Sequence, residues 1–195
     1  MSERKPSDDS STSQVHVWFL RGVNVGGAHA LPMAALRDHL GELGAEDVKT
    51  YIQSGNVVFT APAQLASALP GLFEVEAPAR YGFAVPVVSR TAAQLQAVVE
   101  YNPFLRAPPA GSAFDHKQHH LGLWQEKAAA TLLSRLEQED FQPDEYAVHD
   151  REIYLYLPAG VAGSKLLKSR GFAKPWGGMT LRNWRTVLKT LAMAT

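Results

Sequence analysis

The sequence contains no cysteine among its 195 residues. Disulfide bonds, thiolate metal ligands and cysteine nucleophiles are therefore excluded, and a reducing cytoplasm is the location that we expect. No apolar run approaches the roughly 20 residues that a membrane-spanning helix needs. The N-terminus is polar and lacks the apolar centre of a signal peptide. We therefore expect no membrane association, and we expect residues 1–14 to form a disordered tail.

Charged residues are also scarce, at 19%, and the net charge is zero. Apolar residues make up 46%, so the chain is long and apolar enough to form one large domain or two small ones. Residues 1–150 carry 11 lysines and arginines against 18 acidic residues, whereas residues 151–195 carry eight against one. A basic C-terminal segment on an acidic body suggests an anionic ligand or an internal docking surface, and the alternative is an ordinary solvated surface.

What the sequence does contain is a recurring order of strands and helices. In the first half, β-branched and aromatic runs predict strands over residues 15–20, 48–52, 57–60 and 83–88. Apolar residues at helical spacing predict helices over residues 32–43, 62–73 and 91–100, the last capped by Thr91. The strand-helix-strand-strand-helix-strand order is that of a ferredoxin-like unit.

The second half begins with the same order, after a proline-rich linker at residues 102–114. Strands are predicted over residues 119–124, 146–149 and 152–157, and helices over residues 127–138 and after Ser164. Thr180 is the expected N-cap of a last helix that buries Trp184. We therefore predict an α+β protein of two ferredoxin-like subdomains with antiparallel or mixed sheets, over residues 15–101 and 115–195.

The sequence RGVNVGG, which follows the first strand, is a candidate ligand loop. It lacks the Lys-Ser/Thr of a P-loop, and its glycines do not have the spacing of a dinucleotide-binding loop. Gly26 and Gly27 would let backbone N–H groups approach an anion, to which Arg21 and Asn24 would add donors. The alternative is a tight connection that needs glycine only for its backbone angles.

A second polar turn, QSGN, links the two strands of the expected hairpin. Serine, glycine and asparagine are favoured in such turns for local reasons. Gln53 and Asn56 also flank Ser54 closely enough for their amide groups to converge on one ligand. Both interpretations remain open at the level of sequence.

The C-terminal region supplies cations for such a site. Arg182 and Arg185 fall in the first turns of the predicted last helix, where the helix dipole disfavours each cation by roughly 0.3–1 kcal/mol. A carboxylate partner or a bound anion would relieve this cost. Lys165, Lys168 and Arg170 are candidates for the same cluster.

No catalytic pattern accompanies these features. His116, His119 and His120 form H-x-x-H-H without a cysteine or an HExxH motif, so we expect no metal site. The sequence has no GxSxG motif and no paired-carboxylate pattern, and we expect no cofactor. The residues therefore do not identify a reaction.

The motifs RGVNVGG, TYIQSGNVVF, SKL and RNW together resemble a known family. This is the bacterial domain of unknown function 1697 family, and the resemblance covers the chain apart from its N-terminal tail. It implies a compact α+β protein with ferredoxin-like character in two subdomains, and no established activity. It also implies recurring polar positions, which here are Arg21, Asn24, Gln53, Ser54, Asn56, Lys165, Arg182 and Asn183. Leu181 and Arg185 depart from the family pattern, which weakens the assignment of ligand contacts beside them.

Three functions fit the sequence, and it does not fix the oligomeric state. The one that we favour is binding of an anionic partner, either a nucleotide or other phosphate-bearing small molecule, or nucleic acid. Its contacts would come from Arg21, Asn24, Gly26, Gly27, Gln53, Ser54, Asn56, Lys165, Arg182 and Asn183. The alternatives are an enzyme acting on a small phosphorylated or carboxylated substrate and a scaffold or interaction protein without a ligand. An RNA-binding sheet would expose aromatic rings, for which the candidates are Tyr51, Phe59, Tyr154 and Tyr156.

Overall fold

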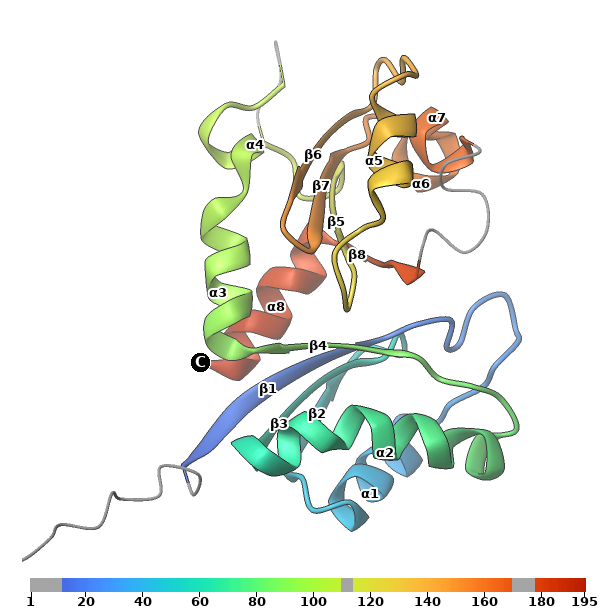
Figure 1. Cartoon of the computed structure of the whole chain (residues 1–195), viewed down its shortest axis with the longest axis vertical. Helices are drawn as coiled ribbons and strands as arrows, with labels where there is room; N and C mark the ends of the chain where they lie inside the picture. Colours follow the sequence, from blue (N-terminus) through green and yellow to red (C-terminus); the bar gives the residue numbers. More distant parts are fainter. Residues whose placement is uncertain (1–11, 110–113, 170–177) are drawn as a thin grey trace, which may run out of the picture.

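Two four-stranded antiparallel sheets form the framework of the protein, and Figure 1 shows them one above the other. The structure is a computed structural model that describes residues 12–109, 114–169 and 178–195. The tail expected at residues 1–14 therefore lies almost entirely outside the described residues. Arg170, a member of the expected cationic cluster, also lies outside them.

The N-terminal sheet has the strand order β2-β3-β1-β4. Its strands are β1 (Ser13–Leu20), β2 (Glu46–Tyr51), β3 (Asn56–Pro62) and β4 (Val87–Thr91). Helices α1 (Met33–Glu42) and α2 (Ala63–Tyr81) cover one face, and α3 (Ala92–Tyr101) continues from β4 (Figure 1). This is the ferredoxin-like arrangement that the order of elements predicts.

The C-terminal sheet repeats that arrangement with the order β6-β7-β5-β8. Its strands are β5 (His119–Leu123), β6 (Glu145–His149), β7 (Glu152–Tyr156) and β8 (Thr180–Asn183). Its helices are α5 (Ala130–Leu136), α6 (Gly160–Gly163) and α7 (Lys165–Lys168), while α4 (Pro103–Arg106) lies in the expected linker. The α+β class with two ferredoxin-like units is therefore confirmed.

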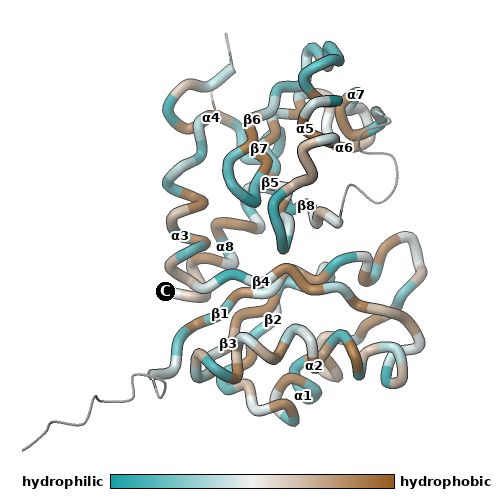
Figure 2. The backbone as a smooth tube through the Cα atoms, viewed as in Figure 1, coloured by the Kyte–Doolittle hydropathy of each residue, from teal (hydrophilic) through white to brown (hydrophobic). Residues whose placement is uncertain are grey.

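The last helix, α8 (Trp184–Ala194), packs between the two sheets with α3 beside it (Figure 1). One apolar core joins both sheets here, through Val17 and Phe19 of β1, Leu121 of β5 and Trp184 of α8. Trp184 is 1% exposed, so its expected place in the core is confirmed. Figure 2 shows the hydrophobic colouring concentrated along β1 and β3, whose two faces are both covered.

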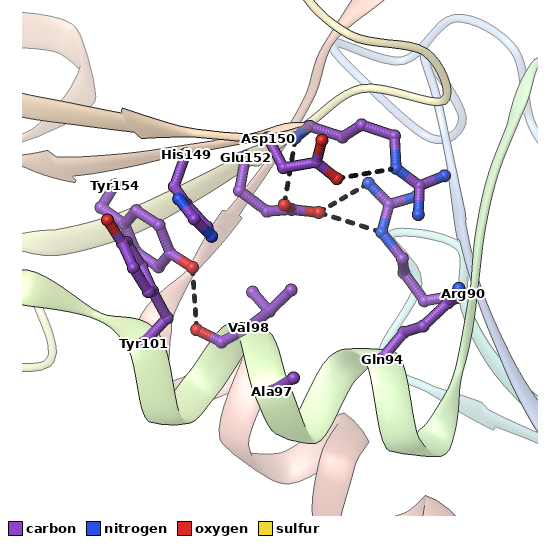
Figure 3. A pocket seen from close by; sticks show the side chains of 10 residues that line it. Arg90, Gln94, Ala97, Val98, Tyr101, His149, Asp150, Glu152 and Tyr154 are labelled. Atoms are coloured by element: carbon purple, nitrogen blue, oxygen red, sulfur yellow. Dashed lines mark hydrogen bonds and ion pairs between the residues drawn. The ribbon is translucent and has the colours of Figure 1, made fainter.

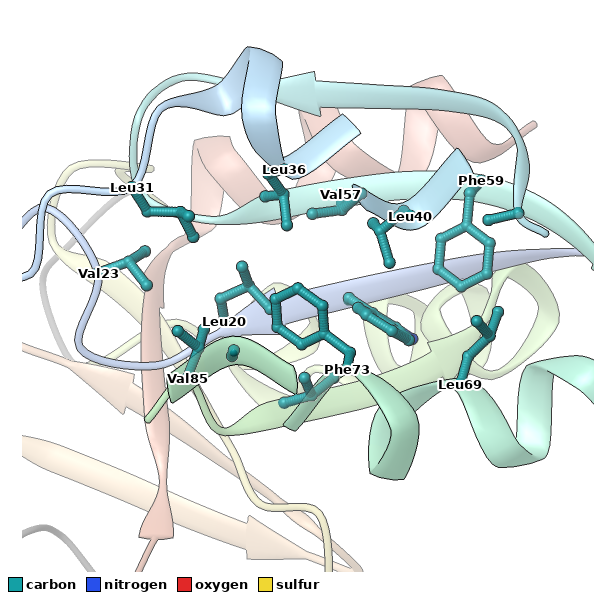
Figure 4. Packing of buried hydrophobic residues seen from close by; sticks show 14 of the residues in the cluster. Leu20, Val23, Leu31, Leu36, Leu40, Val57, Phe59, Leu69, Phe73 and Val85 are labelled. Atoms are coloured by element: carbon teal, nitrogen blue, oxygen red, sulfur yellow. The ribbon is translucent and has the colours of Figure 1, made fainter. Parts of the chain in front are cut away.

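A separate core lies on the outer face of the N-terminal sheet. Figure 4 shows Leu36 and Phe73 beside Leu20 of β1, and Leu40 and Leu69 on either side of the cluster near Phe59 of β3. Burial of each such side chain stabilises the fold by about 1.5–3 kcal/mol. This core holds the N-terminal sheet rigid beneath the turns that follow its strands.

The start of the last helix was predicted wrongly. Residues 180–183 form strand β8, which pairs with β5, and α8 begins only at Trp184. Asn183, rather than Thr180, is its N-cap, because the Asn183 side chain accepts a hydrogen bond from the N–H group of Arg185. Arg182 therefore lies in a strand, and the argument from the helix dipole does not apply to it.

Other element boundaries follow from local chemistry. Thr91 forms the expected cap of α3 as part of a capping box with Gln94, and Ser164 caps α7 as expected. Helix α2 extends well beyond the predicted residues 62–73 and contains two prolines that conceal its length in the sequence. Among the helices of the described residues, none is long and apolar enough to span a bilayer.

Three buried histidines make the stability of this fold sensitive to acid. His16, His119 and His120 each have a ring nitrogen buried without a partner among the described residues. Burial lowers the pKa of all three rings. Below the unfolded-state pKa of about 6.5, the unfolded chain therefore binds more protons than the folded chain. The free energy of unfolding should fall as the pH drops through and below 6.5.

We predict that urea denaturation between pH 7.5 and 5 will show this loss and that His119→Phe will reduce it. The ring of His119 stacks on Phe114 at 3.9 Å, so an aromatic replacement fits the site. His116→Asn is the matched control, because His116 is exposed. The explanation fails if His119→Phe keeps the full pH dependence of the parent protein.

Candidate functional site

The guanidinium group of Arg182 lies where the two sheets meet and is 8% exposed. Its five N–H groups donate to five acceptors, which are the side chains of Asn56 and Thr180 and the carbonyl groups of Leu20, Ser54 and Leu181. The donor–acceptor distances run from 2.5 to 2.8 Å. A guanidinium has five N–H donors in all. Arg182 therefore has no donor left for a ligand.

The positive charge of Arg182 is held by neutral groups alone. Within the described residues no carboxylate lies at ion-pair distance from it. Its guanidinium lies 5.5 Å from the ring centroid of Phe19, which adds a cation–π contact. Burial lowers the pKa of Arg182 to about 10. The group therefore stays charged at neutral pH and contributes an uncompensated positive charge to the junction.

The QSGN turn is built to reach Arg182. The Asn56 side chain accepts from Arg182 through Oδ1 and donates through Nδ2 to the Tyr51 carbonyl (3.0 Å) and the Ser54 hydroxyl (2.9 Å). Gly55 has φ +71°, and a Cβ atom there would lie 2.6 Å from that of Leu20. Glycine is thus required at position 55 because the turn packs directly on β1.

The RGVNVGG loop forms a small hairpin of its own. The Ala28 N–H donates to the Val25 carbonyl at 3.0 Å, and Gly26 and Gly27 have φ values of 58° and 78°. Two successive positive φ values are those of a type I′ turn, which favours glycine strongly. The glycine pair is thus explained by backbone geometry, the alternative that the sequence left open.

Asn24 joins the two turns. Its Nδ2 donates to the Gln53 carbonyl (2.7 Å) and the Leu31 carbonyl (3.0 Å), and its Oδ1 accepts from the Leu31 N–H (2.8 Å). All three bonds go to the backbone, so the Asn24 amide is occupied in holding the loops together. The Gln53 side chain, by contrast, is exposed and has no hydrogen-bond partner among the described residues.

Among the described residues at this junction, Arg21 is the cation without a hydrogen-bond partner for its side chain. Its backbone N–H donates to the Pro86 carbonyl at 2.9 Å, and its side chain reaches the start of β8, where a Cβ atom on Gly178 would lie 3.3 Å from Arg21 Nη1. The residue is half-buried. In the described part of the chain its guanidinium contacts no hydrogen-bond acceptor and no carboxylate.

The structure therefore brings together most of the sequence-predicted positions at one end of the N-terminal sheet, through Arg182, Asn56, Asn24 and their partners. Lys165 is placed elsewhere, because its Nζ donates to the Gln142 carbonyl at 2.6 Å. Asn183 caps α8 and donates to the His116 carbonyl at 2.9 Å. Lys168 and Arg185 are exposed, and neither is among the five hydrogen-bond partners of Arg182.

Sequence reasoning missed the acceptors that matter most. Three of the five groups that hold Arg182 are backbone carbonyls, which carry no signature in a sequence. Thr180 was assigned to a helix cap, although its hydroxyl accepts from Arg182 at 2.7 Å. In the described part of the chain, no group of three histidine, aspartate or glutamate side chains is placed to hold a metal ion.

Residues 14–154 match a family model described as protein of unknown function (DUF1697). The protein is a member of the DUF1697 family. The match ends before Ser164 and Arg182, so the resemblance at SKL and RNW stays a prediction.

This DUF1697 protein also matches a solved structure, that of the conserved bacterial protein SP0830 from Streptococcus pneumoniae. The two chains are 24% identical with a TM-score of 0.72, and the match covers 94% of this chain and 100% of the other. Identity at this level shows a shared fold. A comparison with curated proteins finds no match.

We predict that Arg182→Gln will lower the free energy of unfolding of this DUF1697 protein by at least about 3 kcal/mol. The substitution strands several buried acceptors, each of which costs about 1–3 kcal/mol when unpaired. Urea denaturation at pH 7.5 measures the change. Arg182→Lys has three donors in place of five, so its free energy of unfolding should lie between those of the parent protein and Arg182→Gln.

The control for this substitution is Arg185→Gln on the first turn of α8. Arg185 is exposed, so removing its charge should change the free energy of unfolding by no more than about 0.5 kcal/mol. A loss below 1 kcal/mol for Arg182→Gln would show that the five hydrogen bonds do not secure the junction.

Proposed function

We propose that this protein binds a small anionic molecule, such as a nucleotide or another phosphorylated or carboxylated compound, at the junction, with Arg21 as the charged contact. The observation that carries the proposal is that Arg21 is half-buried and that its guanidinium meets no acceptor among the described residues. A guanidinium binds a carboxylate or a phosphate through two parallel hydrogen bonds. We also keep the cytoplasmic location as a prediction.

Arg182 supports this proposal through its charge rather than through contact. Its Nη2 donates to the Leu20 carbonyl at 2.7 Å, directly beside Arg21 in the chain. Neither arginine has a carboxylate partner in the described part of the molecule. Two uncompensated positive charges in neighbouring positions, one of them buried, produce a local field that favours an anion.

Neutral donors are also available beside Arg21. The exposed Gln53 amide has no partner among the described residues, and the N–H groups of Gly26 and Gly27 donate to no acceptor within them. Asn24 fixes the distance between the two turns through its bond to the Gln53 carbonyl. These groups would complete the coordination of a ligand whose charge lies against Arg21.

A small ligand fits the structure better than nucleic acid does. Phe59 and Tyr154 are 1% and 0% exposed, and Tyr51 and Tyr156 are half-buried. RNA-binding sheets of this topology expose their aromatic rings on an open face. Both faces of the N-terminal sheet are covered here, and one available arginine suits a single phosphate or carboxylate group.

The enzyme alternative has weaker support. His39 is fully buried between the Tyr81 hydroxyl (3.0 Å) and the Glu76 carboxylate (2.9 Å), an order of groups that resembles a catalytic relay. Burial raises the pKa of Tyr81, however, whereas an activated nucleophile needs a lowered one. The Tyr81 hydroxyl group is therefore not activated in the way that a catalytic relay requires.

The interaction-protein alternative would use pairs of exposed apolar side chains, such as Val25 and Ile52 at the tips of the turns or Leu72 and Val75 on α2. Val25 is 65% exposed and Ile52 is 51% exposed. Single exposed apolar residues are normal on soluble proteins. Two such side chains form a smaller patch than the several hundred Å² typical of an interaction surface, so we place this function behind anion binding.

We predict that Arg21→Gln will weaken binding of an anion by about tenfold or more, because a hydrogen bond to a charged group contributes about 1.5–3 kcal/mol. Isothermal titration calorimetry with pyrophosphate and with ATP measures this change. Arg37→Gln is the matched control, because Arg37 is exposed on α1 and contacts Thr50. It should leave the affinity unchanged.

Salt dependence separates a small-anion site from a nucleic-acid surface. With one contacting arginine, the logarithm of the association constant should fall with the logarithm of salt concentration at a slope near 1, against about 6–10 for an extended phosphate surface. Equal affinities in the parent protein and Arg21→Gln, or no binding of either anion at millimolar concentration, would refute the proposed function.

A further inference from the structure

A cavity of about 370 Å³ lies between α3 of the N-terminal unit and the β6–β7 hairpin of the C-terminal unit (Figure 3). Its volume falls within the range of about 300–1,000 Å³ that is typical of small-molecule sites. The two units together form its walls, and no residue of the Arg21 junction lines it. Binding of a ligand in this cavity would therefore be independent of the anion binding proposed at Arg21.

A buried ion pair forms one wall of this cavity. Arg90 and Glu152 are 2% and 4% exposed, and Arg90 donates through Nε (3.0 Å) and Nη2 (2.7 Å) to Glu152 Oε1. The other carboxylate oxygen, Oε2, accepts only the backbone N–H of Arg151, at 3.2 Å, among the described residues. Because a carboxylate has about four acceptor sites, Glu152 keeps an acceptor for a donor inside the cavity.

Gln94 supplies the complementary donor. Its Oε1 accepts from the Thr91 N–H at 2.9 Å in the capping box of α3. That bond assigns the oxygen to the helix end and leaves the Nε2 amide, with its two N–H groups, without a partner in the described part of the chain. Gln94 is exposed and lines the cavity, so this donor is accessible from solvent.

The remaining wall is apolar and partly aromatic. Ala97, Val98 and Tyr101 project from α3, and the Tyr101 ring stacks on His149 at 3.6 Å with an interplanar angle of 13°. The Tyr154 hydroxyl donates to the Val98 carbonyl at 2.9 Å, as Figure 3 shows, so its polar end is already satisfied. A flat ring is the shape that such a wall accommodates.

The charges that line the cavity balance. Arg90 and Arg151 are offset by Asp150 and Glu152, with Arg90 paired to Glu152 and Arg151 close to Asp150, which also pairs with Lys127 at 3.0 Å. Both arginines of the lining therefore have a carboxylate partner, in contrast to Arg21, and neither is left as the main contact of an anion. A neutral molecule with one donor and one acceptor matches the groups that remain free.

We propose that this cavity binds a neutral, planar heteroaromatic molecule with an amide-like edge, of the nucleobase class. The edge of the ligand donates an N–H to Glu152 and accepts an N–H from Gln94, while its ring lies against Ala97 and Tyr101. Exocyclic amino groups beside ring nitrogens, as in adenine and cytosine, have this donor–acceptor pattern. Binding joins groups from both units and should therefore also stabilise their contact.

The decisive experiment compares two ligands that differ only at the edge. Calorimetric titration and saturation-transfer NMR should detect binding of adenosine, whereas N6,N6-dimethyladenosine, which lacks the N–H donor, should bind at least about tenfold more weakly. Cytidine has the same edge on a smaller ring and should also bind. Equal binding of the two adenosine derivatives would overturn the proposal, as would failure of both adenosine and cytidine to bind at millimolar concentration.

The matched protein variants are Gln94→Glu and Gln96→Glu. Glutamate at position 94 keeps the acceptor for the Thr91 N–H, so α3 stays capped, but it replaces the amide donor by a carboxylate that repels the ligand acceptor. We expect at least a tenfold loss of adenosine affinity. Gln96 is exposed on the same helix and pairs with Glu100 outside the cavity, so Gln96→Glu adds the same charge without changing affinity.

Two further readouts complete the test. Urea denaturation of Gln94→Glu should give a free energy of unfolding close to that of the parent protein, which shows that the affinity loss is local. Arg21→Gln should leave adenosine affinity unchanged, so failure of this site and failure of the anion site can be distinguished. Adenosine affinity that survives Gln94→Glu would refute the assigned contacts.

Discussion

The relative placement of the two sheets depends on the complete hydrogen bonding of one buried cation. Taking a guanidinium out of water without a carboxylate is costly unless every donor is satisfied. Arg182 meets that condition only when the end of β1, the QSGN turn and the start of β8 are all in position. If one of these bonds is missing, a buried donor is left unsatisfied and the others stabilise the fold less. The five bonds therefore couple the two ferredoxin-like units.

This coupling changes the meaning of the polar motifs. Asn24 and Asn56 use their amides on backbone and turn groups, and Gly26 and Gly27 meet the angles of a tight turn. A residue that is consumed in this way shapes a site without touching its ligand. The binding that we propose would therefore depend on the groups without a partner among the described residues, of which Arg21 is the charged one.

The sequence predicts the parts of the fold that local chemistry determines. The order of elements, the Thr91 cap and the burial of Trp184 each follow from short-range patterns, and the structure confirms them. Strand β8 could not be found, because four residues give too little alternation and lie next to a strongly amphipathic helix. The partners of Arg182 could not be predicted for a different reason, because most of them are backbone carbonyl groups that only the tertiary structure brings near.

Of the described arginines, Arg90 and Arg182 are buried between the units, and their charges are balanced in different ways. Arg90 is paired with the Glu152 carboxylate, which compensates its charge, whereas Arg182 is held by neutral groups and has no carboxylate partner among the described residues. The interior of a protein screens weakly, so this difference persists at the nearby surface. An uncompensated arginine at one junction and a cavity with paired arginines at the other support the two different ligand chemistries that we propose. The duplicated fold thus need not imply duplicated function, because each contact between its halves creates a distinct electrostatic environment.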